Sequence, residues 1–548
     1  MPNGAWGGDY ELPVYPFVPP PDLSGGARRR YPIVIVGGGL SGLTLACDLA
    51  NRGVESVLLD EDDTIGVRGA SSRGICYAQK TLEIFAKLGT YPRIAAKGIT
   101  WSEGKTLAGE DEVYSFSLQH AGASEQPPFV NLQQFYVEWF LVDRIGELGR
   151  CDLRWKNRVL RVEQNDECAI VEVDTPSGGY SLEAEWLIDA TGVNSPIREG
   201  FGLETHTSRI ADRWCITDVR FKDFFPTERW TWIEAPFNEN RAVWQHLMGD
   251  GVWRLDYQMA PDCDPEFVSR REVAEERLRA HLGEIEFDLV WVGPYAYRDH
   301  LLDDFRHGRV FFIGDSAHVV SPFGARGGNT GIQDAFNLGW KLAFVTAGRA
   351  RPALLDTFTP ERHCAAKENL EVTSRTARFL APQSDAERVL RRAAIDLART
   401  HAFARPLVNT GRMSVANRYP ASAVIGDGPR DGQSVHNVPI ALPDGSRSTL
   451  VELSERVGTA FIGLLYAPTR GHEIAAFAWL EATGLPFRFF TCGPGGLGDP
   501  EGKLKAALGA EPGSFALIRP DLYLAGCIPD AKPSQADALL RRALCLQS

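Results

Sequence analysis

Two glycine-rich stretches have the residue types and spacing to hold a phosphate-containing ligand. The first, Gly37-x-Gly39-x-x-Gly42, directly follows the apolar run 33–36 and opens a helical pattern. Glycines at such positions let a pyrophosphate approach the backbone at the positive end of a helix. Asp60 ends the next apolar run, where a carboxylate would accept hydrogen bonds from an adenosine ribose. We therefore predict a dinucleotide site; the alternative is a tight packing turn between strand and helix.

The second stretch, GDSAHVVSPFGARGGNTG (314–331), stands far along the chain at another strand-to-helix junction. A nicotinamide dehydrogenase would complete its cofactor site within the first domain. FAD is longer and needs further backbone contacts for its ribitol and isoalloxazine ring. Asp315 suits the ribitol hydroxyls, and the glycine-rich loop can offer N–H groups to the flavin. The pair of stretches therefore favours FAD over NAD.

The elements around these stretches indicate an α/β fold of two or three domains in 548 residues. Residues 33–60 read as strand, turn, helix and strand, the start of a parallel sheet, and this pattern returns at 309–345. Residues 213–260 read as an antiparallel sheet. The predicted parts are an N-terminal arm (1–30), a discontinuous FAD-binding domain (31–100, 131–204 and 296–400), a substrate-binding sheet domain (101–130 and 205–295) and a C-terminal domain (420–548).

Composition excludes several other classes of protein. The hydrophobic content is 44%, the charged content 24% and the net charge −13, with no basic and aromatic cluster, which argues against nucleic acid as a partner. The ten cysteines form no C-x-x-C pair and no metal-ligand spacing, so we expect a reduced compartment and no metal. No apolar run is long enough for a membrane span, and no secretory signal is visible. The expected location is the cytoplasm.

Five segments carry a pattern that extends beyond the two glycine turns: GGGLSG (37–42), SSRGICYAQKTLEIFAKLG (71–89), NLQQ (131–134), WLIDATGVNSPIR (186–198) and GRVFFIGDSAHVVSPFGARGGNTGIQDAFNLGWKLA (308–343). Together they resemble the class A flavoprotein aromatic hydroxylases, the family of para-hydroxybenzoate hydroxylase, phenol hydroxylase and 3-(3-hydroxyphenyl)propionate hydroxylase. The resemblance covers most of residues 31–400, and the last segment is the most specific. It implies a glutathione-reductase-type, Rossmann-like FAD domain with an antiparallel-sheet substrate domain.

The resemblance also assigns roles to individual residues. Gly37, Gly39, Gly42 and Asp60 would hold the adenosine half of FAD. Arg73 matches an arginine at the pyrophosphate, Gln133 a glutamine at the ribitol, Asp315 the acid of the Gly-Asp pair and Pro322 a proline beside the reactive flavin edge. Gly327, Gly328 and Asn329 match the loop over the ring.

One position departs from the family pattern. The family has Asp-Gly after the WLI strand, with an acid linked to FAD and nicotinamide binding, whereas here Thr191 stands there in DATG. Asp189, two residues earlier, is expected to face the other side of the strand. This departure puts nicotinamide handling in doubt. No second dinucleotide fold is visible, as in the family, and the choice between NADH and NADPH stays open.

The substrate side is expected in residues 228–259. Arg254 matches a family arginine near the flavin, and His246 is our candidate for binding or deprotonating a phenol, for which a pKa near 7 would be useful. A packed histidine is the alternative for His246. Ile75 stands where phenol hydroxylase has an aspartate. Trp230, Trp232 and Trp253 could form an aromatic wall or fill the core of the sheet.

The resemblance implies a single-component monooxygenase that uses FAD, NAD(P)H and O2 to hydroxylate a phenol or catechol through a flavin C4a-hydroperoxide. Displacement of a nitro or halogen group, as in a nitrocatechol-type monooxygenase, is left open, as is a homodimer. The alternatives are a flavin-dependent halogenase, which WTWIEAP (230–236) resembles only loosely, and a non-catalytic FAD protein.

The last part of the chain, 420–548, is expected to form the thioredoxin-like domain of larger family members. Strands are expected near 458–466 and 515–525. Without a C-x-x-C pair, thiol redox chemistry is not supported. A role in packing or dimerisation is therefore favoured.

Overall fold

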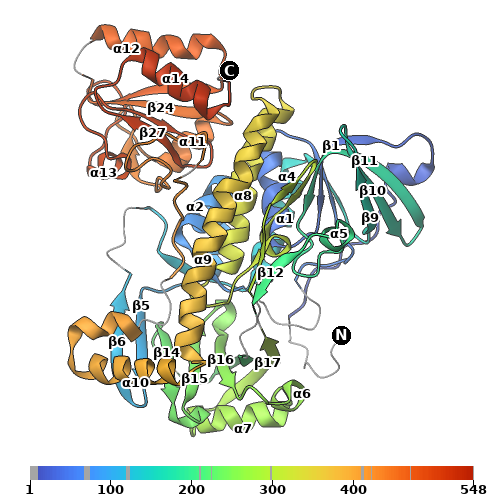
Figure 1. Cartoon of the computed structure of the whole chain (residues 1–548), viewed down its shortest axis with the longest axis vertical. Helices are drawn as coiled ribbons and strands as arrows, with labels where there is room; N and C mark the ends of the chain where they lie inside the picture. Colours follow the sequence, from blue (N-terminus) through green and yellow to red (C-terminus); the bar gives the residue numbers. More distant parts are fainter. Residues whose placement is uncertain are drawn as a thin grey trace.

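The computed structural model places three large sheets around two long helices (Figure 1). The structure describes residues 10–66, 74–118, 124–208, 212–223, 225–296, 299–408, 413–420, 422–468 and 471–546. Within those residues, no helix has the length and apolar character that crossing a membrane requires.

The first sheet has eight strands in the order β19-β20-β11-β1-β2-β8, with β10 and β9 extending from β11. Pairing is parallel from β20 through β8, and residues 33–36 are buried on both faces, which explains their continuous apolar run. The strands are β1 (Arg30–Val36), β2 (Ser56–Leu59), β8 (Cys151–Arg154), β9 (Arg158–Gln164), β10 (Ala169–Thr175), β11 (Gly178–Asp189), β19 (Arg306–His307) and β20 (Val310–Phe312).

Helices pack onto this parallel sheet from several parts of the chain. Helix α1 contacts both α4 and α8, so residues distant in sequence meet behind the first glycine turn. The helices are α1 (Leu40–Asn51), α2 (Gln79–Leu88), α3 (Tyr91–Lys97), α4 (Gln134–Leu148), α5 (Pro196–Gly200) and α8 (Gly327–Thr346).

The second sheet has seven strands in the order β17-β13-β16-β15-β14-β5-β6. Only the β14–β5 pair is parallel. One face is covered by α7 (Arg271–Leu282), next to α6 (Pro265–Val268). The strands are β5 (Glu103–Ala108), β6 (Asp111–Ser117), β13 (Arg213–Phe221), β14 (Arg229–Ala235), β15 (Arg241–Leu247), β16 (Trp253–Met259) and β17 (Phe287–Ala296).

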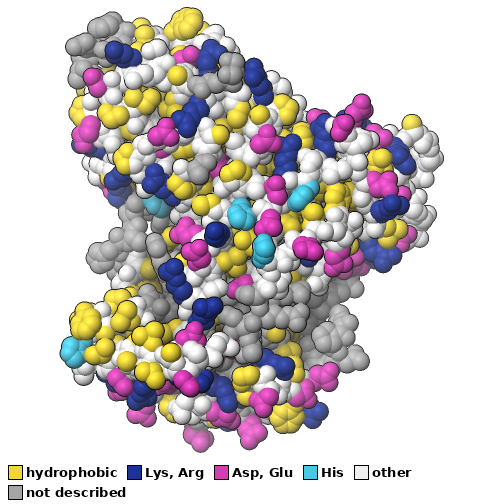
Figure 2. Space-filling model, viewed as in Figure 1, with side chains coloured by type: hydrophobic (Ala, Val, Ile, Leu, Met, Phe, Trp, Pro, Cys, Tyr) yellow, Lys and Arg dark blue, Asp and Glu magenta, His cyan; other side chains and the backbone are white. Residues whose placement is uncertain are grey.

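The other face of this sheet packs against the rest of the molecule through Phe323, α9 (Phe358–Leu380) and α10 (Asp385–Thr400). Helix α10 lies against β6 of the seven-stranded sheet. From the sequence we assign residues up to 400 to the FAD-binding domain, and this domain limit stays a prediction. Exposed apolar side chains of this region, including Val389, Leu390 and Phe403, gather at the end of the molecule that carries α10 (Figure 2).

Two small sheets link the large ones. They comprise β3 (Cys76–Ala78), β7 (Phe129–Asn131) and β4 (Ile99–Thr100), and β12 (Thr205–Ser208), β18 (Asp299–Leu302) and β21 (His318–Val319). Through β21, the second glycine-rich stretch is therefore tied to residues that enter and leave the seven-stranded sheet.

The C-terminal unit has a four-stranded sheet in the order β25-β24-β26-β27, with one parallel and two antiparallel pairs. Its assignment as thioredoxin-like stays a prediction, as do the exact domain limits. Helix α9 runs from beside this unit towards the seven-stranded sheet (Figure 1). The elements are β22 (Pro439–Ala441), β23 (Arg447–Thr449), β24 (Phe461–Tyr466), β25 (Phe487–Cys492), β26 (Phe515–Ile518), β27 (Leu524–Ile528), α11 (Leu450–Val457), α12 (Gly471–Ala478), α13 (Lys503–Leu508) and α14 (Pro533–Ala543).

The N-terminal arm is packed from residue 10 onward. The Tyr15 ring stacks on Trp155 with centroids 4.5 Å apart, and the Asp22 carboxylate pairs with Arg154 at 2.9 Å. The arm thus follows the surface beside residues 60–66, where Thr64 donates a 2.6 Å hydrogen bond to the Pro13 carbonyl.

Candidate active site

The first glycine turn lies between β1 and α1, and its geometry requires glycine at two of three positions. Gly37 has φ +107°, and a Cβ there would lie 2.5 Å from the Ala190 carbonyl oxygen. A Cβ on Gly42 would lie 1.9 Å from the Gly37 oxygen, whereas one on Gly39 would meet nothing within 4 Å. Gly37 and Gly42 therefore allow close backbone packing, and Gly39 leaves open space at the N-terminus of α1.

Asp60 follows β2 beside this turn, as the sequence predicts. Its Oδ2 accepts a 2.5 Å hydrogen bond from Gly38 N–H and its Oδ1 a 2.8 Å bond from Asp62 N–H. Burial raises the pKa of Asp60 to about 6, although both backbone bonds oppose the shift. The carboxylate is therefore held beside the turn and is ionised at neutral pH.

The second glycine-rich stretch lies directly against the first. Gly314, in the 3-10 turn after β20, has φ +58°, and a Cβ on Gly314 or on Gly331 would lie 2.4 Å from Ser41 Oγ. This close approach brings α1 and α8 together at one edge of the parallel sheet. Asp315 is exposed at that edge, where it can face a ligand.

A buried ion cluster fixes this stretch from behind. Asp334 accepts a 3.0 Å hydrogen bond from Gly314 N–H and pairs with His318 and Arg362, both at 2.6 Å. Burial alone would raise the pKa of Asp334, but the two partners lower it to about 2. Arg362 also donates to the Tyr419 hydroxyl at 2.7 Å. Sequence reasoning missed this cluster, although His318 and Asp334 both stand in the matched segment.

Helix α8 begins at Gly327, so the predicted loop over the ring is the first turn of a helix. First-turn N–H groups have no partner within the helix and sit at its positive end. Gly328 and Pro322 are exposed here. Asn329 is different: its Oδ1 accepts from Ala78 N–H at 2.9 Å and its Nδ2 donates to the Cys76 carbonyl at 2.8 Å. Its side chain therefore ties α8 to β3, and a contact of its backbone with the flavin stays a prediction.

Gln133 is buried at the start of α4, and its amide joins three segments. Its Nε2 donates to the Tyr10 hydroxyl at 3.0 Å and to the Gly249 carbonyl at 2.9 Å. Its buried Oε1 has no hydrogen-bond partner within the part of the chain that the structure describes. Arg73, the predicted pyrophosphate ligand, lies outside the described residues.

The acid two residues before Thr191 is fully buried at the end of β11. Asp189 Oδ1 accepts from Thr191 N–H at 2.9 Å and from the Thr191 hydroxyl at 2.6 Å. Its carboxylate also accepts from the Ser195 and Ser316 hydroxyls. Asp189 therefore fixes the DATG turn against the 3-10 turn that carries Asp315, and does not replace the missing family acid.

Strand pairing brings four polar side chains into one row across the seven-stranded sheet. His246 lies opposite Arg254, which lies opposite Asp218, and the β14–β15 register continued by one pair sets Arg229 opposite His246. All four are buried. We call Arg229, His246, Arg254 and Asp218 the polar row. Arg254 makes a two-pronged contact with Asp218 at 2.9 and 3.0 Å.

The environment of His246 differs from the sequence expectation. Burial, together with the Arg229 and Arg254 charges, lowers the pKa of His246 well below its usual value. The imidazole is therefore neutral and a weaker base than the expected pKa near 7 would give. Its Nδ1 is buried without a partner in the described structure, and its Nε2 lies 3.9 Å from Asp256. Burial raises the pKa of Asp256 to about 6, with Arg254 opposing the shift.

The three tryptophans considered for an aromatic wall lie on the opposite face of the sheet. Trp232 and Trp253 belong to the core beneath α7, and Trp230 packs against it. On the face of the polar row, Trp214 and Trp244 stack with centroids 4.9 Å apart, and Trp244 meets Phe323 edge to face at 4.8 Å. Phe323, next to Pro322, thus joins the second glycine-rich stretch to the face of the sheet that carries the polar row.

The two glycine-rich stretches fit a long dinucleotide such as FAD. The open position at Gly39, the partly buried Asp60, the exposed Asp315 and the exposed start of α8 leave room and polar groups for such a ligand, and their contacts with FAD stay a prediction. No group of three histidine, cysteine or acidic side chains suited to a metal occurs among the described residues.

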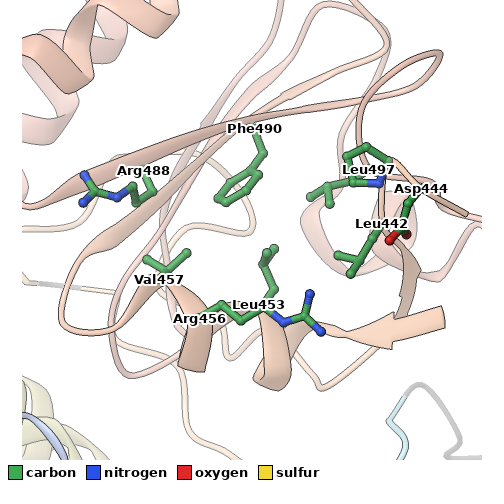
Figure 3. Close-up of a pocket in the computed structure, with 9 residues that line it drawn as sticks. Leu442, Asp444, Leu453, Arg456, Val457, Arg488, Phe490 and Leu497 are labelled. Atoms are coloured by element: carbon green, nitrogen blue, oxygen red, sulfur yellow. The ribbon is translucent and has the colours of Figure 1, made fainter. Parts of the chain in front are cut away.

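A separate pocket of about 440 Å³ lies in the C-terminal unit (Figure 3). Leu453, Val457 and Phe490 give it apolar surface, and Arg456 and Arg488 add charge. It contains none of the residues of the FAD site or the polar row.

Comparison with known proteins supports the same assignment. Residues 30–373 match the family model described as FAD binding domain. The 4-methyl-5-nitrocatechol 5-monooxygenase of Burkholderia sp is 27% identical over 97% of this chain and 99% of its own length. The anhydrotetracycline monooxygenase of Streptomyces rimosus is 29% identical over 76% and 82%.

Two solved structures share the fold. The flavin-dependent monooxygenase PieE, in complex with FAD and substrate, has a TM-score of 0.77 and 21% identity over 94% of this chain and 99% of its own. Aklavinone-11 hydroxylase, in complex with FAD and aklavinone, has a TM-score of 0.76 and 22% identity over 95% and 100%. The chain belongs to the FAD binding domain family, and its relatives include class A FAD-dependent aromatic hydroxylases.

Proposed function

We propose that this protein is a single-component flavoprotein monooxygenase that hydroxylates a phenolic or catecholic ring with NAD(P)H and O2. The observation that carries the proposal is the contact between Phe323, beside Pro322 of the second glycine-rich stretch, and Trp244 beside the polar row. A flavin bound at the two glycine-rich stretches would therefore lie next to a substrate ring bound on the face of the sheet that carries the polar row. The comparisons support a FAD-dependent monooxygenase as the general class.

The first glycine turn and Asp60 would hold the adenosine half of the cofactor. Asp315, Gln133 and the first turn of α8 would hold the ribitol and the flavin ring, and Arg73 the pyrophosphate. When bound, FAD supplies the chemistry that accepts hydride from NAD(P)H and activates O2. The protein positions the ring, excludes water through Trp214, Trp244 and Phe323, and binds the substrate hydroxyl.

His246 is suited to that last task. A neutral imidazole with a free nitrogen can accept a hydrogen bond from a phenolic hydroxyl and orient it. Arg254, neutralised by Asp218, fixes the row next to His246. A ring whose hydroxyl is already polarised attacks an electrophilic oxygen more readily.

Single-ring substrates are the favoured class. The nitrocatechol monooxygenase matches nearly the whole chain, and the 3-(3-hydroxy-phenyl)propionate/3-hydroxycinnamic acid hydroxylase of Mycolicibacterium smegmatis matches 92% of it at 25% identity. Displacement of a nitro group belongs to this proposal. A homodimer stays a prediction, for which the exposed apolar side chains of α10 offer a surface.

The test is a panel of substituted phenols and catechols added to the FAD-loaded enzyme. We expect at least one ring to accelerate NAD(P)H oxidation and to give a product one oxygen heavier, or released nitrite from a nitrocatechol. A flavin that is reduced at the same rate with every ring, with no oxygenated product, would contradict the proposal.

A further inference from the structure

Arg229, at the start of β14, is a buried cation without an acidic partner. Its side chain is only 9% exposed. No carboxylate of the described residues lies within 4 Å of its guanidinium, and its hydrogen-bond partner there is the Met413 sulfur at 3.1 Å. A thioether is a weak acceptor. Because a buried guanidinium is costly without a negative partner, the arrangement is incomplete as it stands.

Two tryptophans hold this guanidinium in place. It lies 5.9 Å from the Trp101 ring centroid and 5.7 Å from that of Trp244. Trp101 is itself fixed by a 2.9 Å hydrogen bond from its Nε1 to Asn131 Oδ1. An aromatic face attracts a cation by about 0.5 to 2 kcal/mol. It makes no hydrogen bond to the N–H groups, which lie in the plane of the guanidinium and can donate to an acceptor there.

No carboxylate of this face forms an ion pair with Arg229 among the described residues. Asp218 is committed to Arg254 by two hydrogen bonds. His246, opposite Arg229, is neutral. Asp256 lies in the next row of the same face and interacts electrostatically with Arg229, but it makes no ion pair with Arg229 within 4 Å among the described residues. Arg229 therefore has a counter-charge nearby but no direct carboxylate contact.

The position of this charge is where a substrate would lie. Trp244, which packs on Arg229, contacts Phe323 of the second glycine-rich stretch. Cys76, whose carbonyl accepts a hydrogen bond from Asn329 at the start of α8, has its side chain near Arg229. Arg229 is thus the member of the polar row that lies next to the second glycine-rich stretch.

We infer that Arg229 binds an anionic substituent of the substrate, a carboxylate or a phenolate, and makes the enzyme prefer negatively charged single-ring phenols. The inference rests on the proposed function only in taking the bound anion to be the substrate of the enzyme. A planar guanidinium donates two parallel hydrogen bonds to a carboxylate, which gives orientation as well as affinity. Such an anchor would set which ring carbon faces the flavin.

The test compares two rings of similar shape that differ in charge, 3-hydroxybenzoate and 3-hydroxybenzamide, by calorimetric titration of the FAD-loaded protein. We expect the wild type to bind the benzoate more tightly. Arg229→Gln should weaken benzoate binding about 10- to 100-fold, the usual value of a hydrogen bond to a charged group, and change benzamide binding by less than about twofold. Arg229→Lys should retain part of the preference.

Arg213→Gln is the matched control, because Arg213 lies on β13 of the same sheet with its guanidinium on the Cys263 carbonyl. Equal losses for both rings, an unchanged benzoate affinity, or no binding of either ring to the wild type would overturn the inference. The inference would also be overturned if Arg229→Gln shifted the reduction potential of the flavin but kept the preference for the benzoate. Arg229 would then act on the flavin and not on the substrate.

A failure of the proposed monooxygenase function would give a different result from a failure of the anion site. Tight benzoate binding that depends on Arg229, without oxygenation of any ring, would remove the monooxygenase proposal and leave the anion site. Oxygenation of neutral phenols by Arg229→Gln at the wild-type rate would support both.

Discussion

At the scale of single residues, burial decides which groups of the substrate side carry charge. His246 is 5% exposed and lies between two guanidinium groups of the polar row, so it resists protonation. Burial raises the pKa of Asp256, on the same face, to about 6. At neutral pH His246 is therefore uncharged, whereas Asp256 loses its charge only when the pH falls towards 6.

His246 should make stability depend on pH. Its pKa in the folded protein is well below the value near 6.5 of an unfolded chain, so the unfolded state binds an extra proton below that pH. The contribution is present above about pH 6.5 and is lost as pH falls, by about 1.4 kcal/mol per pH unit at the steepest. The apparent Tm of the wild type should therefore fall more steeply than that of His246→Gln between pH 7.5 and 5.

His401 provides the control for this measurement, because its side chain is exposed. His401→Gln should follow the wild-type Tm at every pH. Parallel curves for the wild type and His246→Gln would show that the imidazole is charged inside the fold, and would restore the general base of ordinary pKa that the sequence suggested.

At the scale of elements, the junction of β1, α1 and α8 is set by close backbone contacts. Gly37 and Gly42 pack the first turn, while Gly314 and Gly331 pack around Ser41. Parallel strands end at this edge, and the helix that follows directs its first N–H groups there. Gly37 and Gly42 thus serve the packing of the turn, and we expect Gly39 to serve the binding of the cofactor.

Two alanine substitutions should separate these roles. Gly42→Ala forces a Cβ to within 1.9 Å of the Gly37 oxygen, so it should destabilise the protein without FAD and lower its Tm by several degrees. Gly39→Ala has open space in the FAD-free protein and should leave that Tm unchanged. It should nevertheless weaken FAD binding, because the methyl group occupies space for the pyrophosphate.

The measurements are thermal unfolding of the FAD-free protein and fluorescence titration with FAD. Equal FAD affinity in Gly39→Ala and the wild type would mean that the pyrophosphate lies elsewhere. A normal Tm in Gly42→Ala would mean that the turn can relax at little cost.

At the scale of the whole molecule, a buried charge network joins the C-terminal unit to the FAD-binding core. Glu361 of α9 accepts hydrogen bonds from Arg519 at 2.8 and 2.9 Å and from Lys341 of α8 at 2.9 Å. Burial alone would raise the pKa of Glu361, but these two cations hold it well below its usual range. Arg519 also pairs with Asp521 at 2.6 Å. The unit is therefore attached through charges that have no access to water.

Glu361→Gln should destabilise the protein by about 3–5 kcal/mol, because it leaves Lys341 and Arg519 buried with less compensation. Urea unfolding of the FAD-free protein would measure the loss. Glu368→Gln is the matched control, since Glu368 lies on the same helix with an exposed side chain and accepts from Asn417. A loss no greater than that of the control would mean that the network contributes little to docking.

The sequence predicts local features of the site well and long-range ones poorly. The glycine turn, Asp60 and the 314–331 junction follow from spacing along the chain, and each lies at the end of a strand as that spacing predicts, while their contacts with FAD stay a prediction. The polar row could not be predicted in full, because its members stand on four strands and only strand register aligns them. Strand register likewise determines that Trp232 faces α7, and the register of β14 shifts only after this residue. Likewise, the helical pattern of α10 is readable, but its packing on β6 is not.

The N-terminal arm has a consequence for the order in which the chain folds. Tyr10, Tyr15 and Asp22 leave the ribosome early, yet their partners Gln133, Arg154 and Trp155 are made much later. Contacts of such large sequence separation close late in folding, because the intervening chain must already be ordered. We therefore expect the arm to dock only after β8 and the start of α4, which carry or adjoin its partners, have formed.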